Sequence, residues 1–121
     1  VTAAVTLTIA QCGWVTCTSA AAYSIVLPTV ATSDGIWYVF EKTDAAANAI
    51  TLDGNGAETI NGAATVADID AQYDTIGIYC DGTAWFIFSR WIHWWKGVLS
   101  NPCAYYIGVS SLTAFPDTVR Q

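Results

Sequence analysis

The side chains that could carry out chemistry are few and are scattered along the chain. The one histidine, His93, is flanked by tryptophans rather than by a carboxylate that could orient it as a general base. Asp68 and Asp70 stand two residues apart on a strand-like stretch and would share one face, as the paired carboxylates of a glycosidase do. For this pair we favour a solvated strand face beside a turn. We therefore predict no catalytic residues and a protein that is not an enzyme.

Three oxygen donors that calcium accepts, Asp53, Asn55 and Glu58, lie within six residues. They do not complete the spacing of an EF-hand loop. A Gly-Asn-Gly corner at residues 54–56 is also what a tight turn requires by itself, since Gly and Asn tolerate a positive φ. We predict a turn here, keep these residues as the weak calcium candidate, and expect no cofactor.

The four cysteines are Cys12, Cys17, Cys80 and Cys103, and their spacing contains no C-x-x-C pair. With a single histidine in the chain, no zinc site is predicted. A hairpin could bring Cys12 and Cys17 together in a disulfide and leave Cys80 for Cys103, although three pairings are possible. Disulfides would indicate an oxidising compartment, whereas reduced cysteines would serve as small buried hydrophobes.

The composition indicates a chain that hides surface against neighbours. Hydrophobic residues make up 54% of the 121 residues and charged residues only 12%, about half the share of roughly 25% usual in soluble proteins. The net charge of −6 argues against a nucleic-acid partner. No run of apolar residues is long enough to predict a membrane-spanning helix.

Apolar residues alternate with polar ones over most of the chain, which is typical of strands. Val5, Leu7 and Ile9 share one face of an expected strand at 5–9. Further strands are expected within 14–18, 23–28, 36–42, 49–53, 64–69, 73–80 and 84–89, with hairpin turns at Asn61-Gly62 and Asp81-Gly82. We predict an all-β fold, an antiparallel β-sandwich or jelly-roll-like single domain over 1–121.

The stretches "VLPT", "YVFEKTDAAANAITLDGNGAETINGAATV" and "AQYDTIGIYCDGTAWFIF" together resemble the β-rich module of bacteriophage tail-fibre and other virion structural proteins. The resemblance covers about residues 23–88. Cys80 and Ala84 depart from it, since the module has polar residues there, and residues 89–121 extend beyond it. The resemblance implies a non-enzymatic, oligomeric building block at the surface of a particle, commonly a trimer, that forms a fibre or decorates a shell.

Tryptophans crowd the start of the C-terminal extension. On an alternating strand Trp91 and Trp95 share one face and Trp94 takes the other, so both faces are apolar. We expect another subunit to cover this strand, and we expect residues 1–12 to form a strand that may exchange with a neighbour. The predicted interface residues are Val5, Leu7, Ile9, Trp91, Trp94, Trp95, Tyr105 and Tyr106.

These features predict a structural subunit of an extracellular or virion assembly, such as a fibre, a filament or a capsid-decorating protein. Its partners would be copies of itself, in a trimer or a head-to-tail filament. The alternative is a carbohydrate- or receptor-binding module of a phage tail fibre, in which exposed indoles stack on a cell-surface glycan. Exposure of the indoles in the assembled state separates the two hypotheses.

Overall fold

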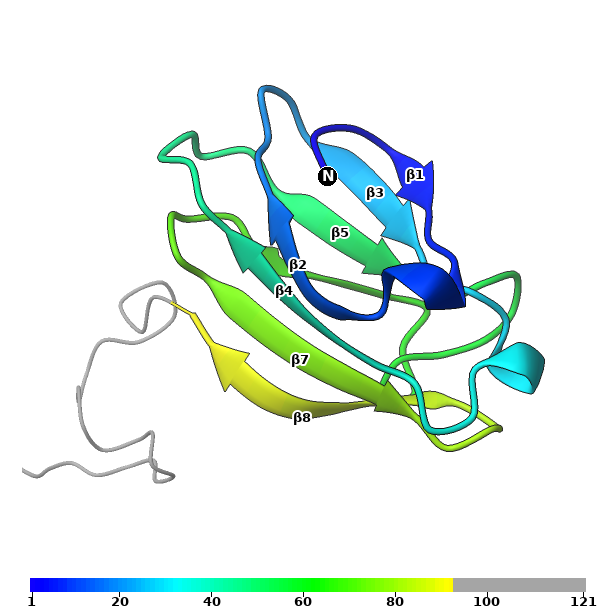
Figure 1. Ribbon diagram of the computed structural model, residues 1–121. Coiled ribbons are helices and arrows are strands. Elements are labelled where there is room, and N and C mark those ends of the chain that lie inside the picture. Colours follow the sequence, from blue (N-terminus) through cyan, green and yellow to red (C-terminus); the bar gives the residue numbers. More distant parts are fainter. Residues whose placement is uncertain (93–121) are drawn as a thin grey trace, which may run out of the picture.

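The computed structural model describes residues 1–92, which form two facing four-stranded sheets (Figure 1). The first sheet has the order β1-β3-β5-β6 and the second the order β2-β4-β7-β8. The strands are β1 (Val5–Thr6), β2 (Gly13–Cys17), β3 (Tyr23–Val26), β4 (Trp37–Lys42), β5 (Ile50–Asp53), β6 (Thr65–Ile69), β7 (Thr75–Cys80) and β8 (Trp85–Trp91). Two 3-10 helices, Ile9–Gln11 and Val30–Thr32, connect strands. The predicted all-β fold is confirmed.

The first five strands alternate between the two sheets. As a result β1, β3 and β5 lie parallel to one another in the first sheet, and β2 and β4 lie parallel in the second. Only the later strands pair antiparallel, β6 on β5, β7 on β4 and β8 on β7. The sandwich therefore contains parallel as well as antiparallel pairs, whereas the sequence predicted antiparallel ones. The cause is that each connection from β1 to β5 crosses to the other sheet instead of folding back beside the preceding strand.

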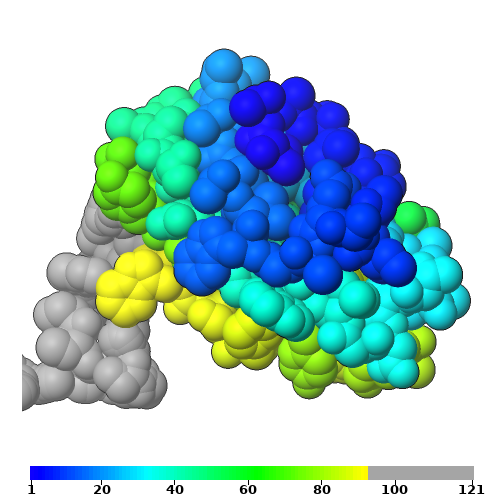
Figure 2. All heavy atoms as spheres, in the orientation of Figure 1, coloured from blue at the N-terminus to red at the C-terminus, as the bar shows by residue number. Residues whose placement is uncertain are grey.

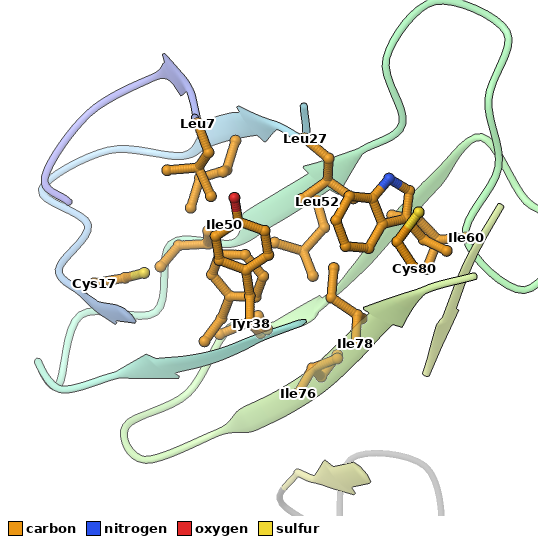
Figure 3. Close-up of a cluster of buried hydrophobic side chains, with 14 residues drawn as sticks. Leu7, Cys17, Leu27, Tyr38, Ile50, Leu52, Ile60, Ile76, Ile78 and Cys80 are labelled. Carbon is orange, nitrogen blue, oxygen red and sulfur yellow. The ribbon is translucent and has the colours of Figure 1, made fainter. Parts of the chain in front are cut away.

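The core lies between the sheets and receives every second residue of the central strands. Ile25, Ile50 and Leu52 enter it from the first sheet, and Tyr38 and Ile76 enter from the second; all five are fully buried (Figure 3). Tyr38 stacks on Phe40 with 5.6 Å between ring centroids. The period-2 pattern thus places one apolar face of each sheet against the other, which is the main source of stability in such a sandwich.

The N-terminal segment differs from its predicted form. Strand β1 comprises only Val5–Thr6, because the chain turns at Thr8 into a 3-10 helix whose Gln11 Oε1 accepts a hydrogen bond from the Thr8 N–H at 2.8 Å. Leu7 is buried in the core and its N–H donates to the carbonyl of Val26. The segment packs on its own domain, and the dark-blue atoms of Figure 2 lie directly against the following strands. In this single chain β1 is paired with β3 of its own domain.

A buried lysine ties together the loops at one end of the sandwich. The Lys42 ammonium is fully buried and donates to Asp44 Oδ1 at 2.5 Å, to the Asp44 carbonyl at 3.1 Å, and to the Ala46 carbonyl. Asp44 Oδ2 accepts from the backbone N–H of Ser19. The hydrogen bond from Lys42 lowers the pKa of Asp44. These contacts fix the connection from β4 to β5.

Asp74 fixes the connection from β6 to β7 in a similar way, through hydrogen bonds to backbone. Its buried carboxylate accepts hydrogen bonds from the backbone N–H groups of Asp70 and Ala71 at 3.1 and 2.9 Å. The carbonyl of Asp74 accepts from the N–H of Lys42. The acids and the lysine at this end therefore support loop geometry.

Candidate functional site

The two outward-facing sides of the sandwich differ sharply in chemistry. Along β3 and β5, the residues that alternate with the buried core positions are small or polar. Ser24 is paired with Thr51 there, and Val26 with Asp53. Such a surface is well suited to contact with water. On the second sheet the corresponding positions are largely aromatic.

We call this second surface the aromatic face. Its rings come from all four strands of the second sheet and belong to Trp14, Trp37, Tyr79, Phe86, Phe88 and Trp91. The exposed fractions are 60% for Trp14, 46% for Trp37, 42% for Tyr79, 53% for Phe88 and 68% for Trp91, and Phe86 is half-buried. Scattered apolar residues are normal on a protein surface, but a contiguous cluster of this kind marks an interaction site.

Strand register places these rings in rows across the sheet. Trp37 is paired with Tyr79, and Tyr79 with Phe86. In the next row Trp14 is paired with Val39, and Val39 with Gly77. Because paired side chains on one face stand within contact distance, the rows form one continuous surface.

Phe88 occupies the centre of the aromatic face. The pairing of β7 with β8 shifts between Gly77 and Ile78, so Phe88 is an extra residue in β8. Its ring lies over Gly77, where a Cβ would stand 2.6 Å from the ring carbon Cζ. Tyr79 contacts Phe86 and Phe88 with centroid separations of 5.6 and 6.4 Å, and the ring planes are inclined by 33° and 48°. The rings thus form a ridged surface, not a flat coplanar platform.

Charge is nearly absent from the aromatic face. Glu41, at the outward position of β4 next to Lys42, accepts a hydrogen bond from Trp14 Nε1 at 3.2 Å, which orients the exposed indole. Arg90 is engaged at the margin, where its guanidinium lies 3.4 Å from Asp68 of β6 in the other sheet. Both partners of that ion pair are about half exposed, so the pair contributes little to stability.

The predicted interface residues fall in different places. Trp91 lies on the aromatic face, and Ile9, in the 3-10 helix, is 44% exposed. Val5 packs partly against the core, and Leu7 is 2% exposed. The prediction for Leu7 is therefore wrong, because the chain bends after β1 and turns this side chain between the sheets. The other four predicted residues, Trp94, Trp95, Tyr105 and Tyr106, lie outside the described residues.

The weak calcium candidate is a turn. Asn55 donates its side-chain amide to the carbonyl of Leu27, and Glu58 Oε1 accepts from the N–H of Val30. A Cβ at Gly54 would stand 2.1 Å from the Glu58 carbonyl oxygen, so the corner needs glycine. Within residues 1–92 no group of three acidic, cysteine or histidine side chains is arranged to hold a metal ion.

The sequence left open whether Cys12 and Cys17 pair in a disulfide, and in the structure both are free. Strand β2 separates the two residues, and an extended strand places them about 16 Å apart, well beyond bridging distance. Cys12 is exposed, while Cys17 and Cys80 are buried as free thiols. Burial raises the pKa of Cys17 to about 11 and also raises that of Cys80. Cys103 lies outside the described residues.

The Asp68 and Asp70 pair is separated by the end of β6. Asp68 lies on the strand and faces Arg90, whereas Asp70 follows the strand in a turn that Asp74 stabilises. The two carboxylates therefore do not share a strand face, contrary to the prediction.

The turn at Asp81-Gly82 connects β7 to β8, as predicted, and Asp81 Oδ1 accepts three hydrogen bonds from Thr83 and Ala84. These bonds lower the pKa of Asp81.

Most of the aromatic face was missed by sequence reasoning, which placed the interface in the N-terminal strand and the C-terminal extension. One signal was present, since β4 is apolar at Trp37 and Val39 as well as at Tyr38 and Phe40. A strand that is apolar on both faces predicts cover on both faces. Trp14 and Phe88 could be assigned to the same surface only from the strand register.

Compared with known proteins, the chain matches no protein-family model and no curated protein sequence. Among residues 1–92, no helix is long and apolar enough to cross a bilayer.

Proposed function

We propose that the protein is a non-enzymatic structural subunit of an extracellular or virion assembly, in which copies of the chain associate with one another. The observation that supports this most strongly is the aromatic face, a contiguous exposed apolar surface on an otherwise well-packed sandwich. Leaving such a surface in water costs free energy, and covering it recovers that cost. In an assembly, a neighbouring subunit covers this surface.

The use of the polar residues supports the same proposal. The buried Lys42 and Asp74 bond to loop backbone, and Glu58 and Asn55 bond to the chain segment before and within the second 3-10 helix. These side chains stabilise a rigid scaffold. A rigid sandwich that presents one apolar face is a suitable building block for a fibre or a shell.

A glycan-binding module is the second candidate, and one observation favours it. Trp14 exposes most of its indole while Glu41 holds the ring N–H at 3.2 Å, a pairing of ring and carboxylate that could receive a sugar. The inclined rings of Tyr79, Phe86 and Phe88 favour protein packing instead, because stacked sugars prefer a flat platform. We therefore rank self-association first.

The test is the mass of the purified full-length chain across a wide concentration range, measured by sedimentation equilibrium and accompanied by negative-stain imaging. We expect species that are multiples of the 12.9 kDa chain, and regular particles or fibres. A chain that stays monomeric at the highest concentration contradicts the structural role. Binding of such a monomer to immobilised glycans would support the second candidate.

A further inference from the structure

We infer that the aromatic face is the contact between copies, and that a second copy of this chain docks its own aromatic face against it, sheet on sheet. This inference rests on the proposed function and specifies the surface that performs it. The residues that form the contact are Trp14, Trp37, Tyr79, Phe86 and Phe88, with Val39 and Gly77 between them.

The first argument is area. A large aromatic residue can bury about 150–250 Å², so five rings that expose roughly half of their surface offer on the order of 500 Å². A stable protein interface buries about 800 Å² on each partner. The neighbouring Thr16 and Thr75 extend this area toward that size, whereas Val39 is buried and adds little. A small ligand would leave most of this area in contact with water.

The second argument is charge. The chain carries a net charge of −6, so two copies repel each other over most of their surfaces. The described outward positions of the second sheet carry one acidic residue, Glu41, and it lies in the outer row with Thr16 and Thr75. The first sheet also presents one acid, Asp53, at its outward positions, so the two sheet faces do not differ in charge. The aromatic face lets copies approach with little like-charge repulsion, and its exposed rings distinguish it from the first sheet.

The third argument is shape. Sheets pack face to face at about 10 Å when their side chains interdigitate. The tip of the Phe88 ring lies over Gly77, and the Tyr79 ring is inclined to those of Phe86 and Phe88, so the surface is ridged. In a two-fold contact the same ridged patch faces itself, and side chains of one copy can pack between those of the other. The inclined rings leave no flat platform for a sugar.

The experiment places a charge on the aromatic face and compares it with the same charge on the opposite side of the sandwich. Trp37→Lys and Tyr79→Lys alter the face, and Ser24→Lys and Thr51→Lys are matched controls on the first sheet. Sedimentation equilibrium measures the dissociation constant of each full-length variant, and circular dichroism checks folding. We expect the first pair to weaken association at least about tenfold and the controls to change it by less than about threefold.

Trp37→Ala and Tyr79→Ala provide the same test if a lysine variant fails to fold, and for them we expect the same direction with a smaller change. Unchanged association in the face variants overturns the inference while leaving the proposed assembly role intact. Equal weakening by the controls also overturns it, because the effect would then be one of general charge. A wild-type chain that stays monomeric overturns both this inference and the proposed assembly role. This holds whether the face is covered by residues 93–121 or binds a glycan.

Discussion

The ring of Phe88 lies directly on the backbone of Gly77, and a Cβ at residue 77 would stand 2.6 Å from its Cζ atom. Gly77→Ala must therefore lift an exposed ring from the sheet. Alanine is also preferred over glycine within a strand by about 0.5–1 kcal/mol, so we expect the unfolding free energy to change by less than about 1 kcal/mol. Association should nevertheless weaken, because the shape of the aromatic face changes. Urea unfolding and sedimentation measure the two effects separately.

Gly54→Ala is the contrasting case. Its Cβ would stand 2.1 Å from the Glu58 carbonyl oxygen, which belongs to backbone and cannot swing away. We expect a loss of about 2–4 kcal/mol in unfolding free energy with no selective effect on association. Urea unfolding of the two alanine variants side by side provides the measurement. Equal stability of the two variants would show that this corner is not as tight as described.

Replacing the buried lysine should loosen the loop from β4 to β5. Lys42→Met keeps much of the stem but removes the donor to the carbonyls of Asp44 and Ala46. We expect destabilisation by about 2–4 kcal/mol, because buried acceptors lose their partner. Hydrogen exchange should show faster opening of residues 43–49. Retention of full stability would mean that the buried lysine contributes little to the fold.

Acid should destabilise the fold through Asp44. The bond from Lys42 lowers its pKa below the usual 3.8. A carboxyl group with a lower pKa in the folded state stabilises the fold above its unfolded pKa, and this stability is lost as the pH falls through the folded pKa. We expect stability to be retained above about pH 5 and to decrease below about pH 4. Asp44→Asn should reduce this dependence, with Asp53→Asn as a control. Identical acid curves for the wild type and Asp44→Asn would contradict this account.

The cysteines should differ in reactivity. In a Cys103→Ser background the exposed Cys12 should react with iodoacetamide in the native protein, while Cys17 and Cys80 react only on unfolding. Burial and the pKa of about 11 both protect Cys17. Peptide mass spectrometry assigns the labelled sites. A linked Cys12–Cys17 peptide would contradict the register of β2.

Trp85 should tolerate loss of its ring nitrogen. It is fully buried, and among the described residues its Nε1 has no hydrogen-bond partner. An unpaired buried donor costs free energy, so Trp85→Phe should lose no more than about 1 kcal/mol, since the lost donor offsets part of the lost packing. Trp85→Ala should lose about 3–5 kcal/mol. Urea unfolding compares the two variants, and losses of similar size would indicate that the nitrogen has a partner.

The sequence predicted the strands better than their partners. Alternation within β4 and β7 follows directly from the burial of Tyr38 and Ile76, and it is visible in the residues themselves. Period-2 patterning carries no information about which strand lies alongside or in which direction. The parallel pairing of β3 with β5 was therefore not predictable. It depends on connections that cross between sheets.

The sequence predicted that an apolar surface exists but not which residues form most of it. An apolar surface that needs cover follows from composition, and Trp91, which was predicted to be covered by a neighbouring subunit, is exposed in the single chain. Leu7 was selected with it because alternation continued past β1, but the bend at Thr8 depends on a local bond to Gln11 that competes with the strand. Trp14 and Phe88 belong to one surface through register and a bulge. Neither feature has a sequence signature of its own here.

The central claim is that copies meet through the aromatic face, and hydroxyl-radical footprinting of the full-length chain tests it most directly. Oxidation of the peptides that carry Trp14, Trp37 and Tyr79 would be compared at concentrations below and above assembly. We predict that these peptides become protected on assembly while the peptide carrying Thr51 is unaffected. Equal oxidation of the aromatic peptides in the dilute and the assembled states would contradict the account.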